Sequence, residues 1–234
     1  MVGTPILVTI SEGKEKSPSE SLSEAVRGGS SPLSARRRRS PLCHRLLGDA
    51  RFHAVKLKYD EDLAAKARAA GCGDCGGRLD SAQYPRKPRG ATSKLPDEYA
   101  WRYSFCCAVD GCRRRHTPPS IRFLGRRVYL GAVVVLATAM QQGVTPIRAQ
   151  RLHEVLGVSL RTLARWREWW RAAFAKSDFW KASRARFSPP VEASGFPLAL
   201  LERFGGDEDV RLLALLRLLA PISTPTGYIS DQRF

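Results

Sequence analysis

Four cysteines in one basic segment have the spacing of metal ligands. They form two pairs, Cys72-x2-Cys75 and Cys107-x4-Cys112, separated by 31 residues. Zn²⁺ favours four thiolates at tetrahedral corners, and a small segment with little apolar material needs such an ion in order to fold. We therefore predict a structural Zn²⁺ whose four cysteine ligands leave no position for water or substrate.

Other ligand sets remain open. Cys106 precedes Cys107, and on a strand the two side chains point to opposite faces. We favour Cys107, with His116 as a further candidate ligand. Free thiols in an apolar core are the alternative to a metal site. The isolated Cys43-His44 pair could also bind metal, but an incidental pair is the preferred interpretation.

A helix-turn-helix pattern follows the cysteines. Thr145 and Pro146 suit the start of one helix, Gly157 suits its left-handed end, and Ser159 can cap the next helix. With Gly157 as the turn glycine, the buried positions of such a motif fall on five apolar residues: Leu152, Leu156, Val158, Leu163 and Trp166. His153 replaces the small alanine usual in this motif, which indicates a wider helix crossing. An ordinary pair of core helices is the alternative.

The polar side chains of these helices suit duplex DNA. Arginine can pair with guanine in the major groove, threonine can touch a phosphate or a thymine methyl, and arginines on the first helix can hold phosphates. The candidate DNA contacts on the two helices are Arg148, Arg151, Ser159, Arg161, Thr162 and Arg165. Two basic runs add Arg113, Arg114, Arg126 and Arg127, although these runs could equally be solvated surface.

The overall charge agrees with a polyanionic partner. The net charge is +17, and the segment from Cys72 to Ala175 holds eighteen Lys and Arg against seven Asp and Glu. Biased amino-acid usage is the alternative explanation. The N-terminus lacks the pattern of a signal peptide, and the apolar run Val128–Met140 is shorter than the roughly 20 residues of a membrane span. We expect a cytoplasmic, nucleoid-associated protein without a membrane partner.

The predicted fold class is α+β: a small zinc-ribbon β domain, then an all-α helix-turn-helix domain, after a disordered N-terminus. The expected divisions are 1–50 (disordered, basic), 51–127 (zinc-ribbon-like), 128–183 (helix-turn-helix) and 184–234 (helical tail). Strands are expected at 55–59, 99–105 and 121–128, and an exposed basic loop at 81–96. Helices are expected at 60–70, 128–142, 146–156, 160–176, 198–204 and 207–219.

Two apolar patterns have competing interpretations. Aromatic residues recur at helical spacing from Trp166 to Trp180 and could stack on unpaired bases, but a core seam is preferred. The leucines between 198 and 219 could bind a second copy of the chain or a transposase, or simply belong to the core.

The order of ribbon and helix-turn-helix resembles the N-terminal DNA-binding region of bacterial insertion-sequence transposases and of small proteins encoded beside them. The resemblance rests on the four cysteines and on residues 145–170. The catalytic domain of those transposases would require three separated acidic residues, whereas Glu202, Asp207, Glu208 and Asp209 cluster in a short tail.

We therefore expect a non-enzymatic, zinc-stabilised, sequence-specific binder of double-stranded DNA, acting as a transposon accessory protein or a transcriptional regulator. The alternatives are an RNA-binding zinc-ribbon protein and an inactive transposase remnant.

Overall fold

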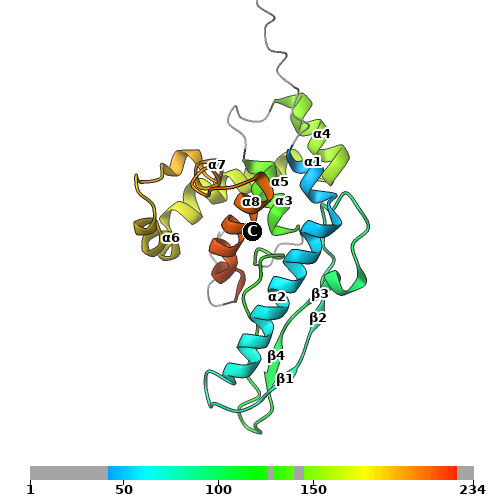
Figure 1. Ribbon diagram of the computed structural model, residues 1–234, viewed down its shortest axis with the longest axis vertical. Coiled ribbons are helices and arrows are strands. Elements are labelled where there is room, and N and C mark those ends of the chain that lie inside the picture. The colour runs from blue at the N-terminus through cyan, green and yellow to red at the C-terminus, as the bar shows by residue number, and fades with distance from the viewer. Residues whose placement is uncertain (1–41, 126–128, 140–144, 226–234) are drawn as a thin grey trace, which may run out of the picture. The chain divides into compact units, whose positions relative to one another are not determined.

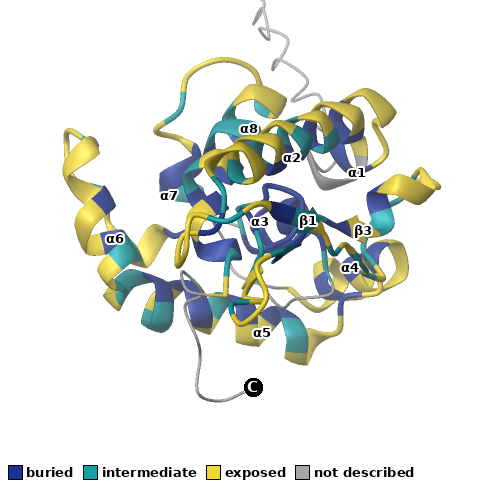
Figure 2. Cartoon of the chain, turned by 90° about the horizontal axis from the view of Figure 1, so that it is seen from below, coloured by how far each residue is buried: buried dark blue, intermediate teal, exposed yellow. Residues whose placement is uncertain are grey.

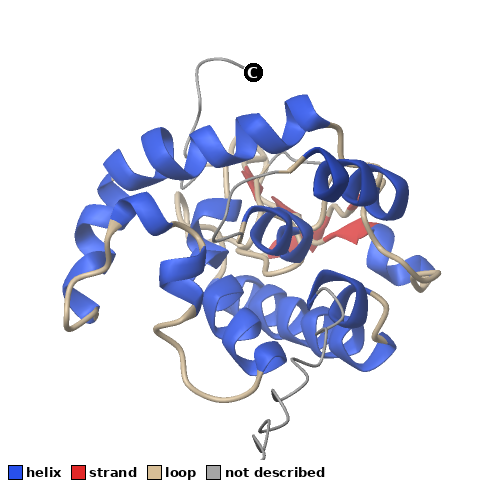
Figure 3. Ribbon diagram, turned by 90° about the horizontal axis from the view of Figure 1, so that it is seen from above, coloured by secondary structure: helices blue, strands red, loops and turns tan. Residues whose placement is uncertain are grey.

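The protein is an α+β molecule that combines many helices with two small antiparallel sheets (Figures 1 and 3). The structure is a computed structural model and describes residues 42–125, 129–139 and 145–225, without the side chains of residues 42–44. Residues 42–47 form the helix α1 (Leu42–Leu47), within the segment that was expected to be disordered up to residue 50. Among the described residues, no helix has the length and apolar character that a membrane crossing requires.

The long helix α2 (Ala50–Ala70) replaces a predicted strand and extends the predicted helix at 60–70 toward the N-terminus. A strand was expected at residues 55–59, but the helix is continuous through them. The Asp49 carboxylate caps the helix by accepting hydrogen bonds from the Arg51 and Phe52 amides. The buried face of α2 includes charged side chains, at Lys56 and Asp60. A search for apolar periodicity could not recognise a buried face of this composition.

Two small sheets follow α2. The strands are β1 (Leu79–Ser81), β2 (Tyr84–Pro85), β3 (Trp101–Arg102), β4 (Phe105–Cys107) and β5 (Arg115–His116). The order β1-β4-β5 forms one antiparallel sheet, and β2 pairs with β3 in the other.

The two long strands expected on either side of the second cysteine pair are absent from the described residues. The first, expected at 99–105, is split by the 3₁₀ turn η1 (Asp97–Ala100) and by the gap between β3 and β4. The second, expected at 121–128, is represented within the described part by one bridge from Phe123 to Leu130. The loop expected at 81–96 contains β2 and has no buried residue.

Helix α3 (Gly131–Thr138) occupies the centre of the core, and all eight of its residues are buried. It packs against α1, α5 and α8, and Figure 2 shows the buried residues gathering on it and on the inward faces of its neighbours. The helix is shorter than the expected 128–142, and the expected terminator Gly143 lies outside the described residues.

Helical structure dominates the C-terminal half. The elements are α4 (Pro146–Leu156), α5 (Leu160–Glu168), the π-helical segment η2 (Trp169–Phe174), α6 (Asp178–Ser183), α7 (Leu198–Leu201) and α8 (Glu208–Leu219). Short 3₁₀ turns occupy η3 (Arg184–Arg186), η4 (Ala193–Gly195) and η5 (Ala220–Ser223). The leucines at 200, 201, 212, 215, 216 and 219 are buried, in agreement with a core role.

The apolar residues form two clusters. The larger contains Tyr99, Ile121 and Phe123 together with α3, α5 and α8, so the expected division between residues 127 and 128 passes through one core. The smaller cluster joins Ala64 of α2 to Leu79, Phe105 and two of the cysteines. The small sheet with its cysteines therefore packs on the C-terminal half of α2 (Figure 1).

A buried ion pair fastens α2 to the rest of the molecule. Arg122 Nε lies 2.8 Å from Asp60 Oδ2, and both side chains are fully buried. The Asp60 carboxylate also accepts hydrogen bonds from the Ile121 amide and the Ser120 hydroxyl. Arg122 donates its remaining N–H groups to backbone carbonyls at residues 99 and 101. All parts of the pair thus have partners, as a buried charge requires.

We predict that Asp60→Ala lowers the free energy of unfolding by about 3–5 kcal/mol, because Arg122 would remain as an unpaired buried charge. Asp62→Ala is the matched control. Asp62 pairs with Lys58 on the exposed side of the same helix, and its loss should cost no more than about 1 kcal/mol. Urea denaturation of both variants measures the difference, and equal losses would contradict the assigned role of the buried pair.

Candidate functional site: a cysteine cluster and a basic helical surface

The structure brings the four predicted cysteines together. The sulfur atoms of Cys72, Cys75, Cys107 and Cys112 all lie within 4.8 Å of one another. The distance from Cys75 Sγ to Cys107 Sγ is 3.4 Å, and that from Cys72 Sγ to Cys112 Sγ is 3.7 Å. Sulfurs bound tetrahedrally to Zn²⁺ at about 2.3 Å would stand about 3.8 Å apart. The cysteines are free thiols, so this cluster could hold a metal ion.

One tight loop and one strand pairing create the cluster. After α2 ends, the Cys72 amide donates to the Gly77 carbonyl and the Gly76 amide donates to the Cys72 carbonyl, which closes a tight loop around the first pair. The pairing of β1 with β4 places Leu79 opposite Cys107 and so carries the second pair to the first. A Cβ on Gly77 would lie only 2.4 Å from Val109 Cγ2 and 3.2 Å from Cys107 Sγ. This close approach explains why glycine occupies position 77.

Backbone amides around the cluster favour the thiolate form. The amide two residues further along the chain donates to each sulfur and lowers the thiol pKa. Burial raises the pKa of Cys72, but its amide donors, together with His116 and Cys112, lower it to about 6. For the other three cysteines the amide is the largest influence, yet burial and the neighbouring thiols raise their pKa values above the ordinary range. A bound cation would relieve this crowding of like charges and allow all four thiols to ionise.

A histidine and a carboxylate border the cluster. His116 Nε2 lies 3.1 Å from Cys72 Sγ and 3.7 Å from Asp74 Oδ2. Arg114 Nη1 lies 3.3 Å from the other carboxylate oxygen of Asp74. His116 can therefore either hydrogen-bond to the Cys72 sulfur or replace a cysteine as ligand. The sequence indicated His116 as a candidate ligand. It did not indicate Asp74 as a neighbour of the site, because the two residues between the cysteines of such a pair vary in type.

Cys106 lies outside the cluster. It pairs across the sheet with Asp80 and Arg115, and its sulfur donates to the Arg113 carbonyl at 3.3 Å. Because side chains alternate along a strand, Cys106 and Cys107 point to opposite faces of β4. The preference for Cys107 agrees with this geometry.

The second candidate site is the pair of helices α4 and α5. Thr145 and Ser159 cap them as expected, by accepting hydrogen bonds from the Arg148 and Thr162 amides. Gly157 ends α4 in the left-handed conformation, with φ 64° and ψ 21°. The five positions expected to be buried are buried: Leu152, Leu156, Val158, Leu163 and Trp166.

The polar residues predicted to contact DNA lie on the outer side of these helices. Arg148, Arg151, Ser159, Arg161 and Arg165 are exposed and Thr162 is half-buried. His153 is also exposed, so its bulk does not occupy the space between the helices. Arg113 and Arg114 are exposed beside the cysteine cluster, while Arg126 and Arg127 lie outside the described residues.

Tyr129 supports the turn between α4 and α5, a role that the sequence analysis missed. Its hydroxyl donates to the Gly157 carbonyl at 2.7 Å, and its ring packs edge-on against Trp166 with centroids 5.0 Å apart. An aromatic residue just before a buried apolar helix carries no sequence signal for this contact. The contact becomes visible only when the two segments meet in space.

The aromatic seam belongs to the core. Trp166, Trp169, Trp170, Phe174 and Trp180 are at most 5% exposed. Trp170 donates its indole N–H to Thr138 Oγ1 on α3 at 2.9 Å. These rings brace α5 and η2 against α3, and base stacking would require them to leave the core.

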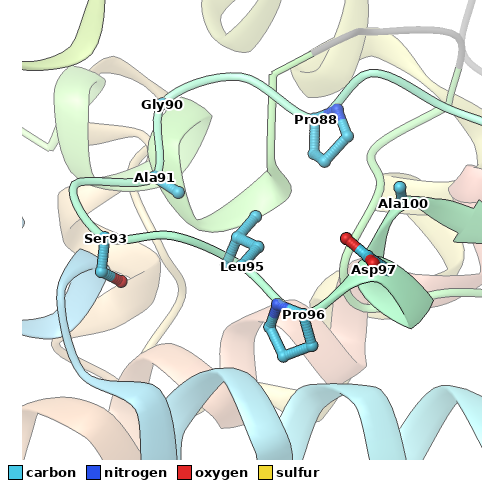
Figure 4. A pocket seen from close by; sticks show the side chains of 8 residues that line it. All are labelled: Pro88, Gly90, Ala91, Ser93, Leu95, Pro96, Asp97 and Ala100. Atoms are coloured by element: carbon cyan, nitrogen blue, oxygen red, sulfur yellow. The ribbon is translucent and has the colours of Figure 1, made fainter.

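A cavity of about 310 Å³ lies beside the 3₁₀ turn η1. Figure 4 shows the side chains of Pro88, Leu95 and Asp97 around it, and its remaining lining is made of small residues and Pro96. One carboxylate and one serine hydroxyl, Ser93, are the polar side chains that line it. This cavity does not bring together the paired groups that acid–base or nucleophilic catalysis needs.

We predict that Cys107→Ser releases the bound metal whereas Cys106→Ser retains it, because only the first change removes a ligand from the cluster. Elemental analysis of the purified proteins should give one metal ion per chain for the wild type and for Cys106→Ser. A chelator should lower the melting temperature of these two proteins and leave Cys107→Ser nearly unaffected. Retention of the metal by Cys107→Ser would contradict the ligand assignment.

We predict that Gly77→Ala weakens metal affinity by about 10- to 100-fold, because the new methyl group displaces Val109 and crowds two of the sulfurs. Gly73→Ala is the matched control, since a Cβ there would have no atom within 4 Å. Competition with a chromogenic chelator measures both affinities. The assigned packing is wrong if the two alanine variants bind metal equally well.

The cysteine cluster and the α4–α5 surface are therefore two features of the described residues that could support a binding function. Comparisons with protein-family models, with curated proteins and with solved structures found no match to this chain.

Proposed function

We propose that this protein binds double-stranded DNA in a sequence-specific manner, with α4 and α5 acting as a helix-turn-helix and with α5 as the recognition helix. The observation that carries the proposal is the division of this unit into two sides. Five of its apolar side chains, Leu152, Leu156, Val158, Leu163 and Trp166, are buried, whereas Arg148, Arg151, Arg161 and Arg165 are exposed. The well-formed caps and the left-handed Gly157 fit the short turn that such a motif requires.

Each arginine has a proposed role that follows from its helix. Arg161 and Arg165 on α5 would enter the major groove, where arginine pairs bidentately with guanine. Arg148 and Arg151 on α4 would hold phosphates and set the register. Arg161 and Arg165 are exposed, and they follow the helix start by one and five residues. In helix-turn-helix complexes the base contacts come from this N-terminal part of the recognition helix.

The metal would be a structural Zn²⁺ held by the four cysteines. Four sulfur donors fit a thiophilic ion and leave no open coordination position. When bound, the ion would hold the first cysteine pair, after α2, against the turn that follows β4. Arg113 and Arg114 beside it could add phosphate contacts, so the small sheet would form a second basic surface.

The biological setting is proposed from the sequence resemblance. A zinc ribbon followed by a helix-turn-helix, with no further catalytic domain among the described residues, suits an accessory protein or regulator of a mobile element. The role is binding rather than catalysis, and the location is the nucleoid. A transposase or a second copy of the chain is the proposed protein partner.

The proposal is tested first by selecting bound duplexes from a random DNA pool with the zinc-loaded protein at roughly physiological salt. Binding that is purely electrostatic weakens under these conditions, whereas base recognition persists. We expect a recovered sequence motif. Absence of enrichment with binding that collapses as salt rises, or a preference for single-stranded RNA, would contradict the proposal.

With the selected site in hand, we predict that Arg165→Ala weakens binding by about 5- to 150-fold and relaxes the base preference at one position, because a bidentate contact to guanine is lost. Arg151→Ala should weaken binding to all sequences alike. It should also reduce the slope of log affinity against log salt concentration by about one, because one phosphate contact is lost.

Arg184→Ala serves as the control for this series. Arg184 is also exposed but lies in η3, away from the proposed recognition helix. The three affinities are measured by fluorescence anisotropy on the selected duplex and on scrambled DNA. Recognition of bases by α5 is ruled out if Arg165→Ala and Arg151→Ala weaken every sequence to the same extent.

A further inference from the structure

A large apolar side chain stands on the outer side of α5. Leu160, the first residue of the helix, is 62% exposed. Seven large apolar side chains are exposed in the described part of the chain, and three of them, Ile147, Val155 and Leu160, belong to the α4–α5 unit. A single exposed leucine is common on protein surfaces. The neighbours of Leu160 therefore decide what it can do.

The neighbours of Leu160 place it on a positively charged face. Leu160 and Ala164 are one turn apart and form one row along the helix surface, and Arg161 and Arg165 form the adjacent row. All four residues are exposed. The arginines attract the phosphates of a duplex and so bring this face toward a groove. Because Ala164 is small, the helix can approach base edges closely along the row that Leu160 begins.

The two hydroxyl side chains of the same turn are engaged with each other. Ser159 Oγ accepts a hydrogen bond from the Thr162 amide and lies 3.0 Å from Thr162 Oγ1. From the sequence, Thr162 was the residue expected to touch a phosphate or a thymine methyl, but it is half-buried. Leu160 thus offers the more exposed apolar side chain of this turn.

The chemistry of the major groove narrows the contact that a leucine can make. The base edges there present hydrogen-bond donors and acceptors, together with one apolar group, the 5-methyl of thymine. Leucine cannot form hydrogen bonds, so covering a donor or an acceptor with it would leave that group without a partner. Covering a methyl group, in contrast, removes apolar surface from water on both sides. The thymine methyl is therefore the group that gains from contact with Leu160.

We propose that Leu160 is a specificity-determining residue, which contacts the 5-methyl group of a thymine while the arginines of α5 pair with neighbouring bases. The inference rests on the proposed DNA-binding function and names one base that α5 would recognise. A 5-methylcytosine presents the same methyl group in the major groove, and thymine is the source that we assign.

Replacement of single thymines by uracil in the selected duplex tests the proposal, because uracil lacks only the 5-methyl group. We expect the motif to contain a fixed thymine at which uracil weakens binding of the full-length, metal-loaded protein by about 3- to 5-fold, the effect of one buried methyl group. Leu160→Ala should bind the thymine and uracil duplexes with nearly equal affinity. Fluorescence anisotropy on the paired duplexes measures both ratios.

Ile147→Ala is the matched control. It removes an apolar side chain that is 82% exposed, but from α4 rather than from the proposed recognition helix. This variant should keep the wild-type ratio between thymine and uracil duplexes. The wild-type comparison needs no variant at all, so it tests the methyl contact even if Leu160→Ala fails to fold.

The assignment fails if the recovered motif has no fixed thymine, if uracil is tolerated at every position, or if Leu160→Ala keeps the full uracil penalty. Loss of the penalty in Thr162→Ser, which removes only a side-chain methyl group, but not in Leu160→Ala would transfer the contact to Thr162. Tighter binding of a duplex with 5-methylcytosine at this position would replace thymine as the source of the methyl group.

These outcomes are distinct from failure of the proposed function. In each of them a recovered motif still supports sequence-specific binding, and only the role of Leu160 or the identity of the base changes. Failure to recover any motif would instead refute sequence-specific DNA binding, and the thymine contact with it.

Discussion

The buried ion pair between Asp60 and Arg122 is the constraint on which the arrangement of the molecule depends. It joins the middle of α2 to the segment after β5, and through the Arg122 guanidinium to backbone carbonyls at residues 99 and 101. Ser120, whose hydroxyl donates to the Asp60 carboxylate, also donates its amide N–H to the Ser223 hydroxyl oxygen. One charged network therefore connects α2, η1, β3 and the C-terminal turn. Because buried charges tolerate no missing partner, these segments must fold together.

The same helix links the two halves of the molecule. The first half of α2 contributes Phe52 to the large core, and its second half contributes Ala64 to the cluster around the cysteines. Between them Lys56 is buried with its ammonium 4.3 Å from the centre of the Phe52 ring, and burial lowers its pKa to about 7. The cysteine cluster begins at the residue after the Gly71 cap of α2. Binding of a metal there would fix the end of an element that the large core already holds.

Sequence patterns succeeded where the physical cause was local. Thr145, Gly157 and Ser159 marked helix boundaries because capping depends on neighbouring atoms, and the five apolar positions of α4 and α5 followed from helical periodicity. They failed where the cause was distant. The segment expected to be a strand at 55–59 is helical, and Asp60, the next residue of α2, is buried against partners some sixty residues away, at Ser120, Ile121 and Arg122.

For the candidate sites, the sequence by itself determined which residues could act: four cysteines in two spaced pairs, a capped helix pair and a surplus of positive charge. These features depend on residue type and on separations of a few positions, which the chain fixes before it folds. Tertiary structure decided the rest. It directed Cys107 rather than Cys106 into the cluster, brought Tyr129 to the carbonyl of Gly157, and buried Trp166, Trp169, Trp170 and Trp180. Each of these outcomes depends on packing between segments far apart in the chain, and no local pattern records such packing.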